Sequence, residues 1–244
     1  MSLGIVIQAR LASTRLPNKI VLPIDGEVCF LEILLDRIKE HFNKIPIILA
    51  TSTNKENDLL EKYANKFGVE FFRGEEQNVL KRFVDCSEEY DLKTIIRVCS
   101  DNPFLDINHL KMLIDQYNGE DYFSFAINGK PSILTHYGFF SEIVSSKSLK
   151  KVLNSSINNC FEHVTNCIYS NQEKFNVRFV EKNIENKNIR CTLDTKQDFE
   201  NLQKIHFEWY RNNRDKSLES LISFIEKNSE IEEKMKNQIE TNRK

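Results

Sequence analysis

Short apolar runs of strand length alternate with amphipathic segments of helical spacing along the first half of this chain. The apolar runs are residues 3–7, 46–51, 69–72, 94–99 and 122–127. The amphipathic segments between them are residues 29–42, 56–67, 78–90 and 107–117. Strands that are joined by helices pair in parallel, and strands that are buried on both faces are continuously apolar. The alternation therefore predicts an α/β fold of three layers, with a mostly parallel sheet covered by helices on both faces.

The alternation stops near residue 130, and the following part of the chain is less regular. Residues 130–172 hold a loop, the stretch HYGFFSEIVSS and two predicted helices. Strands are expected again at 175–181 and 189–193, followed by a helix over 195–211. The second half thus adds strands to the sheet after an interruption of about forty residues.

The C-terminal part differs from the rest in composition, because residues 212–244 are dense in Lys, Glu and Asn. One amphipathic helix is predicted by the apolar residues Leu218, Leu221, Ile222, Phe224 and Ile225. Residues 230–244 are expected to be frayed or disordered. We therefore expect one domain over 1–211, followed by a charged helix or tail over 212–244.

Composition excludes several classes of protein. A chain of 244 residues with 40% hydrophobic residues can bury a sizeable core, and its net charge of −2 does not suggest a nucleic-acid-binding protein. No apolar run is long enough to cross a membrane, and Met1 leads directly into a strand rather than a signal peptide. The six cysteines are scattered without zinc-ligand spacing, so buried free thiols in a reducing cytoplasm are expected.

A basic loop follows the first predicted strand. Arg10, Arg15 and Lys19 lie within ten residues, with Ser13 and Thr14 between them. Ligands of open α/β sheets bind beyond the carboxyl ends of the strands, and Arg and Lys are the side chains that bind polyphosphates. The loop is neither a P-loop nor a dinucleotide-binding fingerprint. The pattern favours a phosphate site, although a solvated cluster of surface cations has the same composition.

Two aspartates follow predicted strands in the same way. Asp101 lies in the sequence Ser-Asp-Asn-Pro after the strand at 94–99, and Asp194 follows the one at 189–193. Carboxylates at such positions suit a divalent cation, while an Asp in an Asp-Asn-Pro turn also bonds commonly to the backbone. Thr195 and Asp198 form a capping box for the next helix.

Arg97 and Arg190 lie inside the strands that lead to these two aspartates. A buried guanidinium needs a partner, so we expect both arginines to pair with carboxylates and to support the aspartate loops. This is a positioning role beside the site.

Six motifs resemble, in order, those of the CMP-sugar cytidylyltransferases. They are IQARLASTRLPNK, FFRGEEQNVLKRF, IIRVCSDNPFLD, HYGFFSEIVSSKSLKKV, FEHVTNCI and IRCTLDTKQDFENL. This group contains the 3-deoxy-manno-octulosonate and acylneuraminate cytidylyltransferases, and the chain is most similar to the spore-coat polysaccharide branch. The resemblance implies a Rossmann-like nucleotidyltransferase fold with a small insertion for dimerisation and acceptor binding at 130–172. It also implies a homodimer that transfers CMP from CTP to a hydroxyl of an acidic sugar and releases pyrophosphate.

The resemblance also implies roles for individual residues. The nucleotide-binding set is Gln8, Ala9, Arg10, Ser13, Arg15, Lys19 and Arg82. The acceptor and dimer region contains Glu142, Glu162 and His163. Mg²⁺ is expected on Asp101 and Asp194, and the residues expected to act in catalysis are Arg10, Lys19 and Asp101. The cations would neutralise the β- and γ-phosphates.

The chain departs from the family pattern at a few positions. Cys99-Ser100 replaces the usual Thr-Gly before the first metal aspartate, Asn78 and Lys81 replace acidic residues, and Phe161 replaces an Arg. These departures leave the acceptor undetermined. Two other classes stay open: a glycosyltransferase, which would need an Asp-x-Asp motif that Asp101-Asn-Pro does not supply, and a non-catalytic nucleotide-sugar-binding protein.

Overall fold

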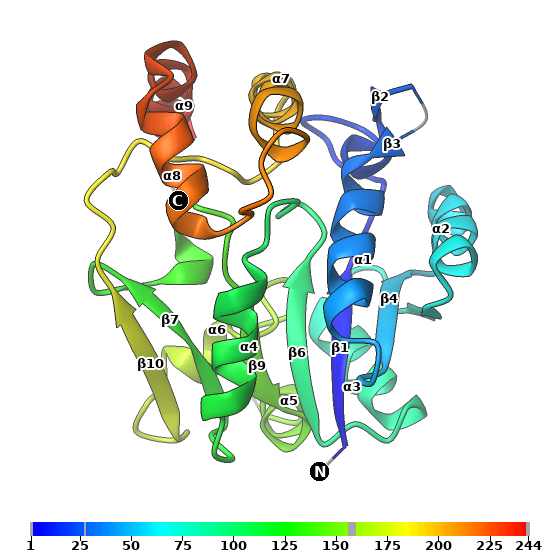
Figure 1. Ribbon diagram of the computed structural model, residues 1–244. Coiled ribbons are helices and arrows are strands. Elements are labelled where there is room, and N and C mark those ends of the chain that lie inside the picture. The colour runs from blue at the N-terminus through cyan, green and yellow to red at the C-terminus, as the bar shows by residue number, and fades with distance from the viewer. Residues whose placement is uncertain (1, 27, 156–159, 243–244) are drawn as a thin grey trace.

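An eight-stranded sheet forms the centre of the computed structural model, which describes residues 2–26, 28–155 and 160–242 (Figure 1). The strands are β1 (Leu3–Gln8), β4 (Ile47–Ser52), β5 (Glu70–Gly74), β6 (Thr94–Cys99), β7 (Tyr122–Ile127), β8 (Lys130–Pro131), β9 (Glu142–Ser145) and β10 (Val177–Lys182). Their order across the sheet is β10-β7-β9-β6-β1-β4-β5, and β8 pairs with β7 at one side. A separate hairpin pairs β2 (Pro23–Asp25) with β3 (Val28–Cys29).

Most neighbouring strands are parallel, as the sequence predicts. β1 pairs in parallel with β4 and β6, β5 with β4, and β10 with β7. The exception is β9, which lies antiparallel between β6 and β7. A strand at Glu142 is one of two interpretations of the residues after HYGFF, but its antiparallel place inside the sheet was not predicted, because its four residues lie in the irregular segment 130–172.

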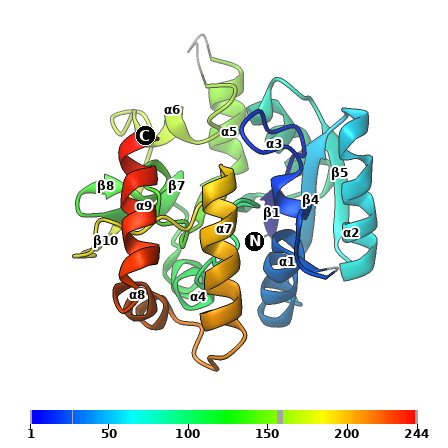
Figure 2. The same ribbon diagram turned by 90° about the horizontal axis from the view of Figure 1, so that it is seen from above.

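Helices cover both faces of the sheet, which confirms the predicted three-layer α/β fold (Figure 2). The helices are α1 (Phe30–His41), α2 (Leu59–Phe67), α3 (Val79–Glu89), α4 (Ile107–Gln116), α5 (Ser146–Leu153), α6 (Asn166–Tyr169), α7 (Lys196–Ile205), α8 (Leu218–Glu226) and α9 (Ser229–Thr241). Successive side chains of a strand point to opposite faces. Accordingly Ile5 and Ile7 of β1 pack with α1, α4 and α7, while Val6 packs with α3 and α5 on the other face.

The expected strand at 189–193 is absent from the described sheet. This segment is extended and buried, but its backbone bonds to two loops at the carboxyl ends of the strands. The Cys191 N–H donates to the His136 carbonyl at 3.0 Å, and the Leu193 N–H donates to the Asp101 carbonyl at 2.8 Å. The prediction was wrong because apolar burial alone does not distinguish a sheet strand from an extended segment packed across the end of a sheet.

The prediction of a frayed C-terminus is also wrong for the described residues, because α9 spans Ser229–Thr241. Its Ile231 and Met235 are buried in the same core as α1 and α4, and they join Leu221 and Ile225 of the predicted helix α8. Apolar residues four positions apart stabilise α9 through packing, which outweighs its charged composition. The division at residue 211 stays a prediction, and residues 156–159, 243 and 244 of the predicted segments lie outside the described residues.

One pair of cysteines contradicts the expectation of free thiols. Cys160 and Cys167 form a disulfide with a Cα–Cα distance of 5.8 Å. Cys29, Cys86 and Cys191 are buried free thiols, as expected. Burial raises the pKa of the Cys29 thiol to about 11 and that of Cys86 to about 12, so these two groups stay protonated at neutral pH.

Among the described residues, no helix combines the length and apolarity that a membrane crossing requires.

Candidate active site

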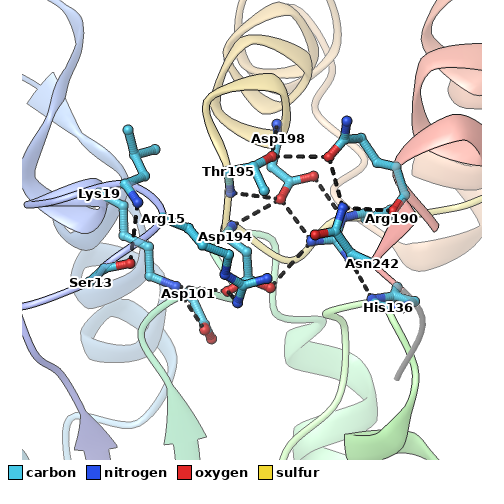
Figure 3. Close-up of polar contacts among 12 residues, drawn as sticks. Ser13, Arg15, Lys19, Asp101, His136, Arg190, Asp194, Thr195, Asp198 and Asn242 are labelled. Atoms are coloured by element: carbon cyan, nitrogen blue, oxygen red, sulfur yellow. Dashed lines mark hydrogen bonds and ion pairs between the residues drawn. The ribbon is translucent and has the colours of Figure 1, made fainter. Parts of the chain in front are cut away.

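Three segments that are distant in sequence meet at the carboxyl ends of β1 and β6. The first is the basic loop after β1, the second is the loop that carries Asp101, and the third is the segment that ends at Asp194 (Figure 3). The Ser100 N–H donates to the Gln8 carbonyl at 3.0 Å, which joins the first two segments. The bond from the Leu193 N–H to the Asp101 carbonyl joins the second to the third. Backbone hydrogen bonds therefore set the spacing of the candidate site.

The 189–194 segment approaches a loop that contains Gly138. The φ angle of Gly138 is +70°, and a Cβ at this position would lie 2.7 Å from the Cys191 carbonyl oxygen. Only glycine tolerates both the positive φ and this contact. The glycine in the stretch HYGFF therefore allows the Asp194 segment to lie against the end of the sheet.

Lys19 lies between the two aspartates. Its Nζ is 3.2 Å from Asp101 Oδ2 and 3.0 Å from Asp194 Oδ1, as Figure 3 shows. Burial by itself would lower the pKa of Lys19, but the charges of Asp101 and Asp194 outweigh it and the net pKa is raised. The ammonium group thus stays charged, and the structure brings together three of the residues that the sequence singled out.

Asp194 receives two further cations. Arg15 lies 3.1 Å from Asp194 Oδ1, and Arg190 lies 3.3 Å from Oδ2. Burial by itself would raise the pKa of Asp194, but Lys19, Arg15 and Arg190 lower it overall. Asp194 is therefore held ionised inside a largely buried cluster.

Arg190 supports the Asp194 segment in the way that the sequence predicts. Its side chain is 1% exposed and donates to Asp198 from Nε at 2.7 Å and from Nη2 at 2.8 Å. Asp198 also accepts the N–H groups of Asp194 and Thr195, and Thr195 completes the predicted capping box of α7. One buried ion pair thus fixes both the start of α7 and the position of Asp194.

Asp101 and Asp194 have the donor chemistry that Mg²⁺ requires. Magnesium is usually bound by one or two protein carboxylates, with water and substrate phosphates completing its shell. Both carboxylates contact the same Lys19 Nζ, so they face a common point. Among the described residues no group of three or more His, Cys, Asp or Glu side chains could hold a metal ion. The two carboxylates therefore suit a Mg²⁺ ion whose other ligands are water molecules and phosphate oxygens of the substrate.

The other residues of the predicted nucleotide-binding set lie in the basic loop or near it. Arg10 is exposed, and Ala9 is buried with its N–H bonded to the Ala50 carbonyl at 3.0 Å. Ser13 Oγ accepts the Leu16 N–H at 3.4 Å, within the loop itself. Gln8 Oε1 accepts from Arg97 Nη2 at 2.9 Å.

Arg82 is 2% exposed and donates to the Glu75 and Glu76 carbonyl oxygens. Burial lowers the pKa of Arg82, and repulsion from Arg10 lowers it further. These two predicted nucleotide residues therefore lie near each other, and an anion between them would relieve their repulsion.

A cavity of about 380 Å³ opens beside Asp101. Its lining includes the polar side chains of Arg97, Cys99, Asp101, Asn102, Ser132, Thr135, His163, Thr165, Tyr169 and Thr192. A volume of this size suits a small molecule, and hydroxyl and amide groups suit sugar hydroxyls. Thr165 and Thr192 were not predicted as site residues, although each lies inside a motif that was identified.

The three predicted acceptor residues occupy different environments. His163 lines the cavity, whereas Glu162 is exposed and does not line it. Glu142 is 2% exposed on β9, pairs with Arg97, and accepts the hydroxyl groups of Tyr122 at 2.5 Å and Thr165 at 2.9 Å. Its internal partners occupy both carboxylate oxygens, so Glu142 positions the cavity walls.

Three of the departures from the family pattern lie together, away from this cavity. Phe161, Asn78 and Lys81 line a separate shallow cleft near α3. The Arg that is usual at position 161 would lie there beside the acidic residues usual at 78 and 81. These three departures therefore replace charged residues in one cleft. Cys99, which belongs to the remaining departure, instead lines the acceptor cavity.

Known proteins that are similar to this chain confirm the family that its motifs resemble. A family model described as Cytidylyltransferase matches residues 4–239. The spore coat polysaccharide biosynthesis protein SpsF of Bacillus subtilis is 31% identical over 91% of this chain and 93% of its own length. Protein MJ1063 of Methanocaldococcus jannaschii is 36% identical over 93% of this chain and 91% of its own. The solved structure of a cytidylyltransferase from Leptospira borgpetersenii covers 95% of this chain and 96% of its own, with a TM-score of 0.81 and 30% identity.

Proposed function

The chain belongs to the cytidylyltransferase family, and on this premise we propose that it transfers CMP from CTP to a hydroxyl group of an acidic sugar, releasing pyrophosphate. The family supports CTP-dependent transfer of CMP in sugar and polysaccharide pathways. The observation that carries the proposal is the convergence of Lys19, Asp101 and Asp194 beside a cavity whose lining includes hydroxyl and amide groups.

Nucleotidyl transfer depends on alignment and charge stabilisation rather than on a covalent intermediate with the protein. In this proposal Arg10 and Arg15 neutralise the β- and γ-phosphates and stabilise the departing pyrophosphate. Lys19, buried between the two aspartates, supplies a third cation at the same point. Arg82 is proposed to approach the nucleotide beside Arg10.

Asp101 and Asp194 are the residues that would hold Mg²⁺. When bound, this ion lowers the pKa of a coordinated hydroxyl group and balances phosphate charge. Arg190 keeps Asp194 ionised and in place for that role.

The acceptor is proposed to bind in the cavity beside Asp101, where Thr165, Thr192 and Asn102 offer hydrogen bonds to sugar hydroxyls. His163 supplies a group that can donate to an acidic substituent. The net charge of −2 favours a small-molecule partner over nucleic acid. The proposal includes a cytoplasmic homodimer with residues 130–172 as its interface, as the family resemblance implies.

Pyrophosphate release tests the proposal. The protein is incubated with CTP, Mg²⁺ and each of a panel of acidic sugars, and UTP replaces CTP in a parallel series. Release that requires CTP and one sugar supports the transferase. In a separate incubation with nucleotide sugars and acceptors, release of a nucleoside diphosphate would indicate a glycosyltransferase. CTP binding without any release would indicate a non-catalytic binding protein.

Asp101→Ala is the corresponding variant. Turnover is expected to fall about a thousandfold or more, because one of the two proposed metal carboxylates is lost. Asp115→Ala, on the exposed face of α4, is the matched control and should keep full activity. Near-normal turnover of Asp101→Ala would contradict the metal assignment.

A further inference from the structure

Lys19 contacts the two carboxylates that would hold Mg²⁺ in the proposed transfer reaction. Its Nζ lies 3.2 Å from Asp101 Oδ2 and 3.0 Å from Asp194 Oδ1. Oxygen ligands bind Mg²⁺ at about 2.1 Å, so an ion on these two oxygen atoms would share them with the ammonium group. A divalent ion and an ammonium group repel each other strongly at such short range. Lys19 and the metal ion therefore compete for the two carboxylates.

The main chain of Lys19 is fixed, whereas its side chain can turn away. The Asn18 N–H donates to the Leu11 carbonyl at 3.0 Å, and the side chain of Ile20 is fully buried. Beyond this anchored backbone, a lysine side chain is a flexible four-carbon stem that carries its charge at the end. In the part of the chain that the structure describes, the hydrogen bonds of Nζ go to the two aspartates alone. The ammonium group can therefore leave them without a change in the main chain.

The charged side chains around Asp194 balance one another. Three cations and three carboxylates form a continuous cluster of ion pairs, namely Arg15, Lys19, Arg190, Asp101, Asp194 and Asp198. Most of this cluster is buried, and the side chains of Lys19 and Asp194 are each 11% exposed. A metal ion added to it would bring two positive charges without a counterion, and uncompensated charge in a buried site is costly. Binding of the ion alone is therefore unfavourable.

A triphosphate changes this balance, because it supplies anionic oxygen atoms next to the cluster. The basic loop that carries Lys19 also carries Arg15, and both side chains reach Asp194 from the side opposite to Arg190 (Figure 3). Phosphate oxygens, like carboxylate oxygens, accept charge-assisted hydrogen bonds from an ammonium group. A bound triphosphate therefore gives Lys19 a new partner and offsets the charge of the ion at the same time.

On the premise of the transfer reaction, we propose that the Lys19 ammonium group holds the place of the metal ion until the nucleotide binds. In the nucleotide-free protein, Lys19 pairs with both Asp101 and Asp194. When CTP binds, Lys19 moves to the triphosphate and leaves the two carboxylates for Mg²⁺. Lys19 thus makes metal binding depend on the nucleotide, and it prevents the two carboxylates from facing each other without a cation between them.

Titration of the nucleotide-free protein with Mn²⁺ tests the proposal. Mn²⁺ prefers the same oxygen ligands as Mg²⁺, and its free concentration is measured by electron paramagnetic resonance. Lys19→Met should bind Mn²⁺ about tenfold more tightly than the unmodified chain, because the competing cation is gone. If Lys19 only stabilised the loop, its loss would weaken Mn²⁺ binding instead. Lys147→Met on α5, which is exposed on the other face of the sheet, is the matched control and should change nothing.

Loss of Asp101 in the same background locates the ion. The double variant Lys19→Met/Asp101→Ala should lose the gain in affinity, because one of the two carboxylates is removed. If Lys19→Met does not fold, Lys19→Gln takes its place, because the amide can still donate to a carboxylate but carries no charge. Thermal unfolding is a second readout. Mn²⁺ should raise the melting temperature of Lys19→Met more than that of the unmodified chain, because a tighter ligand stabilises the folded state more.

The proposal is overturned if Lys19→Met and Lys19→Gln bind Mn²⁺ no more tightly than Lys147→Met. It is equally overturned if the gain in affinity survives in the Lys19→Met/Asp101→Ala variant. The pyrophosphate-release assay judges the metal assignment separately. Turnover that requires Mg²⁺ and falls in Asp101→Ala, together with unchanged Mn²⁺ affinities, would refute the role of Lys19 and leave the proposed transfer reaction standing.

Discussion

Arg97 and Arg190 are both buried arginines that border the candidate active site, but they find their partners in different ways. Arg190 pairs with Asp194 and Asp198, four and eight residues further along the chain. Arg97 pairs with Glu142, which is 45 residues away on the antiparallel strand β9. One arginine therefore organises a single segment, and the other joins several.

The two clusters support different halves of the proposed reaction. The Arg190 cluster fixes Asp194 and the start of α7, on the side of the proposed metal and triphosphate. The Arg97 cluster joins Gln8 of β1 to Glu142, which also holds Thr165, beneath the acceptor cavity. The metal side is therefore built from short local patterns, whereas the acceptor side depends on segments that only folding brings together.

Removing Arg190 should have the largest effect on stability. Arg190→Met leaves the buried carboxylates of Asp194 and Asp198 with one cation fewer, and such losses cost about 3–5 kcal/mol. The measurement is the free energy of unfolding from urea titration. Arg211→Met, which breaks an exposed ion pair with Asp25, is the control and should cost less than about 1 kcal/mol. Equal losses for the two variants would contradict the assigned role of Arg190.

Removing Arg97 should cost somewhat less, about 3 kcal/mol, because Glu142 keeps the hydroxyl groups of Tyr122 and Thr165 as donors. The double variant Arg97→Met/Glu142→Leu should recover much of this loss, because no unpaired charge then remains buried. Urea titrations of the two single variants and the double variant give the coupling energy. Strict additivity of the two single losses would show that the pair does not interact.

The Cys160–Cys167 disulfide is a covalent crosslink on the acceptor side. It closes the segment that carries His163 and Thr165. A crosslink with a separation of 7 residues is expected to stabilise the fold by about 2 kcal/mol, so Cys160→Ser should lower the unfolding free energy by that amount. Thiol titration of the unfolded, unreduced protein should detect the free Cys29, Cys86, Cys99 and Cys191. Detection of all 6 cysteines of the sequence as thiols would refute the bond.

The smallest effect is expected in the pH dependence of the metal side. Burial alone would raise the pKa of Asp194, but Lys19, Arg15 and Arg190 lower it overall. A lowered folded-state pKa contributes stability above the ordinary carboxyl pKa of about 4, and this contribution is lost as the pH falls through the folded value. Asp194→Asn should therefore show a shallower loss of stability in acid than the unmodified chain. Asp115→Asn is the control, and an unchanged slope in Asp194→Asn would exclude the ion cluster as the cause.

Local patterns explain most of what could be predicted. The strands at Thr94–Cys99 and Tyr122–Ile127 have the predicted bounds because each is a mostly apolar run between polar residues. The capping box of Thr195 and Asp198 and the stop of α2 at Gly68, with a φ of +57°, also depend only on neighbouring residues. Such features are encoded within about one helical turn.

Adjacent residues are enough to predict the layered α/β fold, the basic loop and the position of Asp101 at a strand end, because hydrophobic periodicity and end position are local properties. Only the tertiary structure decided that Lys19 lies between Asp101 and Asp194, and that residues 189–193 cross the end of the sheet instead of joining it. It also decided that Glu142 pairs with Arg97. Each of these outcomes depends on which segments pack together. Burial of a charge costs free energy only where packing puts that charge in the interior.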